Sequence, residues 1–279
     1  MTDPMVSTAW LSERLDEPSV RILDASWFMP GSPRVPAAEY AAGHIPGAVR
    51  FDIDALSDQD SALPHMLPAP PDFAIAMRRL GIEPTTTLVV YDSEGLFSAP
   101  RAWWTFRAMG HATVFVLDGG LPRWIDDGHA VESGWREYPH GEFKAHPRAD
   151  LIAGLDSVRD ALEGDLGQVV DARPVGRFSG ETPEPRPGLR RGHMPGAINV
   201  PWSTMVDKGT LLPAAWLKEV FDRAGVDLAK PVITTCGSGV SACVLALALA
   251  RLGKEDVSVY DGSWSEWGGR PETPVVTGP

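Results

Sequence analysis

One cysteine of this sequence lies in a setting suited to covalent chemistry. Cys236 opens the run CGSGVS, which ends at Ser241, and this segment is called the Cys236 loop below. A β-branched run ends just before it at Thr235, and a helical pattern follows it. The two glycines allow the backbone to curl so that several N–H groups point inward, and the positive end of the helix adds to their field. Such a nest lowers the pKa of a thiol and makes it nucleophilic at neutral pH. The residues alone also allow a small buried cysteine without reactivity.

Two reactions use a cysteine in such a loop, namely phosphate-ester hydrolysis and sulfur transfer. Cysteine phosphatases need an arginine six residues after the nucleophile to clamp the phosphate, but this chain has Ala242 there. A loop of small, neutral residues instead suits a thiolate that accepts one sulfur atom and holds it as a persulfide. The loop residues expected to surround that sulfur are Gly237, Gly239, Val240 and Ser241.

A long internal repeat indicates which elements position this loop. The pattern Gly-His-x-Pro-Gly-Ala occurs at 43–48 and again at 192–197, and the runs 22–25 and 116–120 recur at 169–172 and 259–263. A repeat of this length is a whole domain rather than a solenoid unit. We therefore expect two tandem domains, 1–140 and 150–279, joined within the stretch 133–150.

Each copy shows the same order of predicted elements. The runs 88–91 and 232–235 are typical of strands buried on both faces. Helical patterns over 100–109 and 240–252 follow them and end at Gly110 and Gly253, and further strands are predicted at 113–116 and 257–260. Strand, helix and strand in this order predict an α/β fold, with a parallel sheet flanked by helices in each domain. Ligands of such sheets bind beyond the carboxyl ends of the strands, where Cys236 lies.

The first copy differs at the position that matters for chemistry. Asp92 follows the strand of the first copy, as Cys236 follows that of the second. A carboxylate cannot replace a thiolate nucleophile in sulfur chemistry, so we expect the first domain to be catalytically silent. Cys243, two helical turns beyond Cys236, is expected to be a core residue.

Composition excludes several classes of partner. The chain has 25 Lys and Arg against 37 Asp and Glu, a net charge of −12, and so acidic a surface repels nucleic acid and anionic membranes. The sequence shows neither an apolar run long enough to cross a bilayer nor a secretory signal, so we expect a cytoplasmic protein. Two cysteines build neither a disulfide framework nor a four-cysteine zinc site, and we expect no metal and no organic cofactor.

The tandem copies, the Gly-His-x-Pro-Gly-Ala element in each and the run CGSGVSA at 236–242 resemble the two-domain rhodanese-like sulfurtransferases. The neutral loop is similar to the 3-mercaptopyruvate branch of that family, since the thiosulfate branch usually carries basic residues after the cysteine. The resemblance implies that sulfane sulfur passes from 3-mercaptopyruvate to Cys236 with release of pyruvate. The persulfide then passes it to a thiol, a thioredoxin-type protein or cyanide. Thiosulfate:cyanide sulfur transfer and a non-catalytic rhodanese-like binding module are the alternatives.

The same resemblance assigns roles to residues outside the loop. Arg177 and Arg186 match the two arginines that grip the keto-acid substrate, and a planar guanidinium suits a carboxylate. Asp54, His65 and Ser238 match a proposed relay that moves a proton near the sulfur or stabilises the departing enolate. The residues alone also allow surface salt bridges for the arginines and a loop-capping role for His65.

Overall fold

The first half of the chain folds around one parallel sheet in the order β1-β5-β4-β2-β3. The computed structural model describes residues 3–164 and 167–279. The strands are β1 (Met5–Val6), β2 (Val20–Asp24), β3 (Val49–Arg50), β4 (Thr87–Tyr91) and β5 (Val114–Leu117). The helices are α1 (Thr8–Ser12), α2 (Pro36–Ala42), α3 (Pro70–Arg79), α4 (Ala99–Ala108) and α5 (Gly120–Asp126).

The second half repeats this arrangement with the sheet order β6-β12-β11-β7-β8, again parallel throughout. Its strands are β6 (Ile152–Ala153), β7 (Gln168–Asp171), β8 (Ile198–Asn199), β11 (Val232–Thr235) and β12 (Val257–Tyr260). Its helices are α6 (Leu155–Glu163), α7 (Val175–Ser179), α8 (Ala214–Arg223), α9 (Ala242–Arg251) and α10 (Ser263–Trp267). The 3-10 turns η1 (Ala149–Leu151) and η2 (Trp202–Met205) and the hairpin of β9 (Val206–Asp207) and β10 (Thr210–Leu211) complete it. The α/β fold with two parallel sheets flanked by helices is confirmed.

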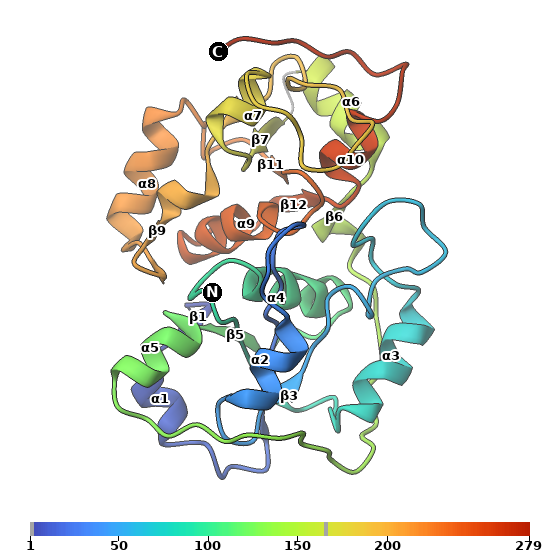
Figure 1. Cartoon of the computed structure of the whole chain (residues 1–279). Coiled ribbons are helices and arrows are strands. Elements are labelled where there is room, and N and C mark those ends of the chain that lie inside the picture. Colours follow the sequence, from blue (N-terminus) through green and yellow to red (C-terminus); the bar gives the residue numbers. More distant parts are fainter. Residues whose placement is uncertain (1–2, 165–166) are drawn as a thin grey trace.

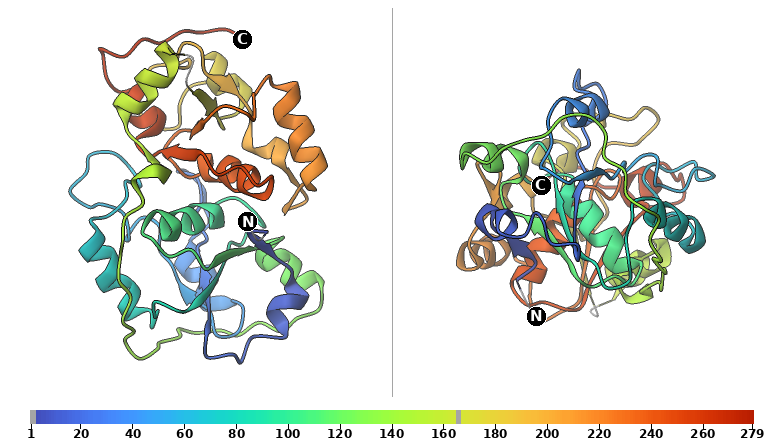
Figure 2. Two further views of the ribbon diagram at one scale, coloured as in Figure 1. Left: turned by 180° about the vertical axis from the view of Figure 1, so that it is seen from behind. Right: turned by 90° about the horizontal axis from the view of Figure 1, so that it is seen from below.

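The two halves pack through α4 and α9, which face each other at the centre of Figure 1. Figure 2 shows the same two-part molecule from behind and from below. Every α9 residue from Ala242 to Ala250 is buried, and α4 is buried on nearly all sides. A helix that is apolar all round belongs inside a protein, and one cluster of buried side chains continues through both helices into both sheets.

The predicted element boundaries agree with the structure to within two residues. Strands β11 and β12 have the predicted bounds, while α4 begins one residue earlier than predicted and β5 one residue later. Helix α9 begins at Ala242 rather than at residue 240, because Gly239 has a φ of +79° and the chain is still turning at the next two residues. Gly110 and Gly253 follow α4 and α9 with φ values of +89° and +78°, the predicted left-handed caps. Among the described residues, no helix is both long and apolar enough to span a membrane.

Candidate active site

The Cys236 loop lies at the carboxyl end of β11, and α10 holds its backbone in place. The Trp264 N–H donates to the Cys236 carbonyl at 3.0 Å, and the Ser265 N–H donates to the Gly237 carbonyl at 2.9 Å. In the described part of the chain, the N–H groups of 237–241 donate no hydrogen bond. Cys236 itself is buried, with 2% of its surface exposed. The loop therefore keeps a set of free donors beside a buried sulfur, as an anion-binding nest requires.

The first domain contains a replica of this nest that is already filled. The segment 92–98, called the Asp92 loop, follows β4, and the Leu121 N–H donates to the Asp92 carbonyl just as Trp264 does in the other copy. Gly95 and Gly239 occupy the same place in the two loops, both with positive φ. One Asp92 carboxylate oxygen accepts three N–H bonds of 2.8 Å each, from Phe97, Ser98 and Ala99. Phe97 corresponds to Ser241 at the end of the Cys236 loop, and Ser98 and Ala99 correspond to the first two residues of α9, so the end of the loop and the start of the helix together surround this carboxylate.

The relay predicted from the resemblance assembles across the domain interface. The His65 ring nitrogen Nδ1 lies 3.0 Å from Ser238 Oγ, and Nε2 lies 3.0 Å from Asp54 Oδ1. The hydrogen bond with His65 is the main cause that holds the pKa of Asp54 below its usual value. The same Nδ1 also lies 3.1 Å from the Ser238 carbonyl oxygen, so one side of the imidazole faces Ser238 and the other faces the Asp54 carboxylate. His65 and Asp54 come from the first domain and Ser238 comes from the second.

Arg177 and Arg186 line one small cavity together with Cys236, and the rest of its wall comes from the loop and from Trp27, Met29 and Phe97. Arg177, on α7, donates through Nε to Glu184 at 3.1 Å, and Glu184 also accepts a 2.8 Å bond from Arg173. Among the described residues, Arg186 has no carboxylate within ion-pair distance, and burial lowers its pKa. Arg186 is therefore the uncompensated cation of this cavity, whereas Arg177 is charge-paired.

Arg101 ties the loop of the second domain to the relay residues of the first, a role that the sequence reading did not assign. This α4 residue is 3% exposed, and its guanidinium donates to Asp261 Oδ1 at 2.7 Å and to the Gly239 carbonyl at 3.3 Å. It also donates to the His65 carbonyl. One buried guanidinium therefore bonds to the backbone of His65 and to the backbone of Gly239, the residue that follows Ser238. Trp27 and Glu184 were likewise missed.

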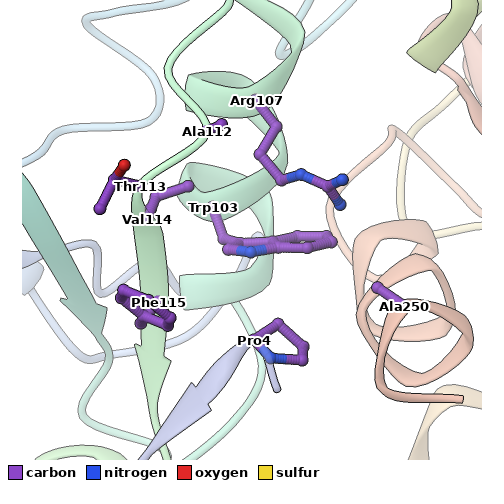
Figure 3. Close-up of a pocket in the computed structure, with 8 residues that line it drawn as sticks. All are labelled: Pro4, Trp103, Arg107, Ala112, Thr113, Val114, Phe115 and Ala250. Carbon is purple, nitrogen blue, oxygen red and sulfur yellow. The ribbon is translucent and has the colours of Figure 1, made fainter. Parts of the chain in front are cut away.

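Two other features lie outside this chemistry. Cys243 donates through Sγ to the Gly239 carbonyl at 3.1 Å, and complete burial raises its pKa, so it stays a neutral thiol. A larger cavity lies between α4, α9 and the start of β5 (Figure 3). The charged group in its wall is Arg107, whose guanidinium carbon lies 4.7 Å from the centre of the Trp103 ring. Neither a thiol nor a carboxylate lines it, and Thr113 supplies the hydroxyl in its wall.

Comparisons with known proteins cover both halves of the chain. The profile of the rhodanese-like domain matches residues 7–127 and 155–270. The chain is 50% identical to the 3-mercaptopyruvate sulfurtransferase of Escherichia coli (strain K12), over 97% of this chain and 96% of that protein. It is 45% identical to the mitochondrial thiosulfate/3-mercaptopyruvate sulfurtransferase 1 of Arabidopsis thaliana, over 98% of this chain and 78% of that protein. The crystal structure of the 3-mercaptopyruvate sulfotransferase SseA from Escherichia coli matches with a TM-score of 0.88 at 47% identity, covering 94% of this chain and 99% of that one.

Proposed function

The chain belongs to the rhodanese-like family, with two copies of the domain in tandem, and from this premise we propose that it is a 3-mercaptopyruvate sulfurtransferase. Its relatives from bacteria and plants, which carry that activity in their names, support the donor. The observation that carries the mechanism is the open nest at Cys236, whose replica in the first domain surrounds the Asp92 carboxylate. The first domain, with a carboxylate at this position, is silent.

The first half of the reaction loads sulfur onto Cys236. Arg186, assisted by Arg177, holds the carboxylate and carbonyl of the substrate, and the Cys236 thiolate attacks the substrate sulfur. The S–S bond forms while the C–S bond breaks, and the bonding electron pair leaves with the pyruvate enolate. The proton of the substrate thiol passes through Ser238 to His65, and Asp54 stabilises the imidazolium that forms. Return of a proton to the enolate carbon gives pyruvate.

The second half of the reaction unloads the persulfide. A carboxylate oxygen of Asp92 is two bonds beyond Cβ, as is the outer sulfur of a persulfide on Cys236, so the nest suits this sulfur as well. An acceptor thiolate, on a small thiol or a thioredoxin-type protein, attacks the outer sulfur, and the Cys236 thiolate leaves. Cyanide attacks in the same way and leaves as thiocyanate. The cycle needs Cys236 as a free thiol, which the reducing cytoplasm maintains.

Thiosulfate is the second candidate donor, since the name of the Arabidopsis relative includes both thiosulfate and 3-mercaptopyruvate. Two features favour mercaptopyruvate. A Cβ on Gly237 would lie 2.7 Å from a guanidinium nitrogen of Arg177, so a basic side chain there would displace Arg177. A dianion beside a thiolate calls for such positive side chains, whereas mercaptopyruvate brings a single carboxylate that the arginines hold away from the sulfur.

Intact-protein mass spectrometry after exposure to 3-mercaptopyruvate tests the proposal. The wild type and Cys243→Ser should each gain one sulfur atom, and Cys236→Ser should gain none. A gain on Cys236→Ser would overturn the assignment of the nucleophile. A higher kcat/KM with thiosulfate than with mercaptopyruvate would overturn the donor. A protein that gains no sulfur from either donor, and forms no thiocyanate, would be the binding module.

A further inference from the structure

We propose that Trp27 is a positioning residue for the relay of Ser238, His65 and Asp54, and that it anchors this relay to the Asp92 loop of the first domain. The inference rests on the proposed function, because it gives the relay a part in sulfur transfer. The Trp27 indole Nε1 lies 3.1 Å from each carboxylate oxygen of Asp54. Trp27 is 6% exposed, whereas 64% of the Asp54 side chain is exposed. A carboxylate so open to water changes rotamer freely unless a rigid neighbour holds it.

The same indole also contacts His65. The Trp27 and His65 rings meet edge to face, with centroids 4.9 Å apart and planes at 83°. His65 Nε2 and Trp27 Nε1 therefore both reach the Asp54 carboxylate while their rings pack against each other. This contact fixes the imidazole orientation that the hydrogen bond to Ser238 requires.

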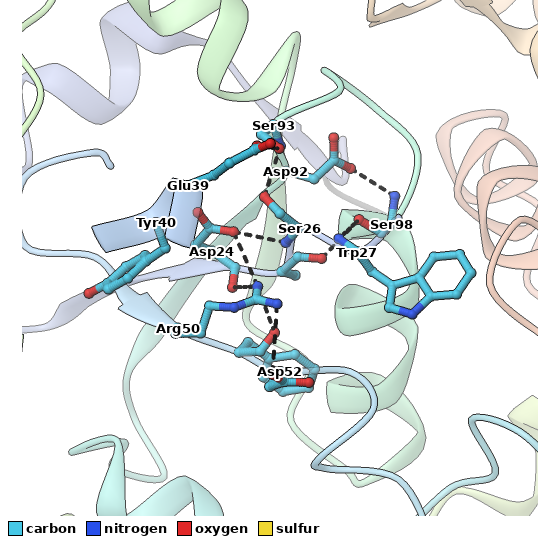
Figure 4. A network of polar contacts seen from close by, with 12 residues as sticks. Asp24, Ser26, Trp27, Glu39, Tyr40, Arg50, Asp52, Asp92, Ser93 and Ser98 are labelled. Carbon is cyan, nitrogen blue, oxygen red and sulfur yellow. Dashed lines mark hydrogen bonds and ion pairs between the residues drawn. The ribbon is translucent and has the colours of Figure 1, made fainter. Parts of the chain in front are cut away.

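Trp27 is in turn held by the Asp92 loop, as Figure 4 shows. Its backbone N–H donates to Ser98 Oγ at 3.1 Å, and that hydroxyl donates to the Ala25 carbonyl at 2.8 Å. The Ser98 N–H donates to the Asp92 carboxylate at 2.8 Å. Ser98 thus connects the Asp92 carboxylate of the first domain to the backbone of Trp27.

The internal repeat argues that the domain fold itself does not need this indole. The segment after β2 reads Asp24-Ala25-Ser26-Trp27, and the matching segment after β7 reads Asp171-Ala172-Arg173-Pro174. The two backbones are held alike, since the N–H groups of Ala25 and Ala172 each donate to the neighbouring strand at 2.8 Å. The second domain folds with Pro174 in this place. Trp27 is therefore explained by what it contacts, which is the relay.

The first test is a double-mutant cycle on the mercaptopyruvate reaction. Trp27→Phe removes the indole N–H together with the five-membered ring but keeps a phenyl ring beside the substrate cavity, so we expect kcat to fall about tenfold and KM to stay within about twofold. In the Asp54→Ala background the same substitution should cause no further loss, because its effect passes through Asp54. Trp124→Phe is the matched control. It removes a buried indole N–H bond of 2.8 Å to the Ala130 carbonyl, far from the site, and should lower stability without lowering kcat.

A second measurement needs no turnover. Carbon-13 NMR can follow the ionisation of the Asp54 carboxyl, assigned by its absence in Asp54→Asn. The charged or hydrogen-bonding groups that face it are His65, Trp27 and Arg186. Loss of the Trp27 donor should raise the Asp54 pKa. An unchanged pKa, an unchanged kcat, or a full loss that persists in the Asp54→Ala background would each overturn the inference. Failure of the proposed function would be seen separately, as a wild-type Cys236 that gains no sulfur.

Discussion

Replacing Arg186 with alanine should cost much catalysis and little stability. Arg186 has no carboxylate partner among the described residues, so its removal leaves no carboxylate without its ion pair in the free enzyme. In the substrate complex, the same change leaves the substrate carboxylate without its cation. Truncating one member of a desolvated charge pair costs about 2 to 5 kcal/mol. That range corresponds to a fall of about 30- to 4000-fold in kcat/KM, at about 1.4 kcal/mol for each factor of ten.

Replacing Arg177 with alanine should instead lower both kcat/KM and the free energy of unfolding. Its side chain is 16% exposed and pairs with Glu184, which is 2% exposed. Breaking a buried pair costs about 3 to 5 kcal/mol when the remaining charge has no other partner. Here Glu184 keeps its 2.8 Å bond to Arg173, so we expect a loss nearer to about 2 kcal/mol in the free energy of unfolding.

The assay combines steady-state kinetics on 3-mercaptopyruvate with urea unfolding of the same two variants. Arg186→Lys is the control, since it keeps the charge and loses the bidentate geometry, and should fall between the wild type and Arg186→Ala. The reasoning is refuted if Arg186→Ala keeps kcat/KM within about threefold of the wild type, or if it loses as much unfolding free energy as Arg177→Ala.

Four further outcomes follow from the geometry. Asp92→Ala leaves buried N–H groups without an acceptor and should lower the free energy of unfolding by about 3 kcal/mol, measured in urea, without creating a second sulfur-accepting site. Gly237→Ala places a methyl group 2.7 Å from the guanidinium of Arg177, so kcat/KM for mercaptopyruvate should fall about tenfold while the thermal midpoint changes little. Arg101→Met leaves a buried carboxylate unpaired and should cost about 3 to 5 kcal/mol of unfolding free energy; a loss below about 1 kcal/mol would contradict this. Because burial raises the pKa of Cys243, iodoacetamide at neutral pH should leave this thiol unmodified, which peptide mass spectrometry can check.

The features that the sequence predicted well are those carried by local pattern or by repetition. The runs 232–235 and 257–260 are apolar and β-branched, and they form strands with those bounds. The glycines that end α4 and α9 take the left-handed conformation that makes glycine favourable there. The resemblance led to His65, Asp54 and Ser238, which the fold brings within hydrogen-bond distance. Their catalytic roles stay a prediction until the variants are measured.

The features that the sequence reading missed are contacts between residues far apart in the chain. Arg101 bonds to Asp261 and to the Gly239 carbonyl, and no spacing rule connects these positions. Glu184 lies close to Arg177 in sequence, yet only the fold shows that it pairs with that arginine and leaves Arg186 unpaired. A comparison of the two copies could have indicated Arg101, because Leu245 stands at the same distance after Cys236 as Arg101 does after Asp92. A buried charge in one copy and an aliphatic residue in the other suggests a task that only one copy performs.

The domain interface shows that, in the described part of the chain, the Asp92 loop lacks a neighbouring histidine as well as a thiol. Two matching hydrogen bonds cross this interface. The Leu67 N–H of the first domain donates to Asp261 of the second at 2.7 Å, and the Leu211 N–H of the second donates to Asp118 of the first at 2.9 Å. Two residues before these leucines stand His65 and Gly209, both with positive φ. Histidine tolerates that conformation at some cost, whereas glycine adopts it freely. The imidazole of His65 contacts Ser238 in the Cys236 loop, whereas Gly209 lies against Gly95 of the Asp92 loop. Among the described residues, the Asp92 loop therefore has neither a thiol nor an imidazole beside it, and under the proposed function His65 and Asp54 of the first domain serve the Cys236 site.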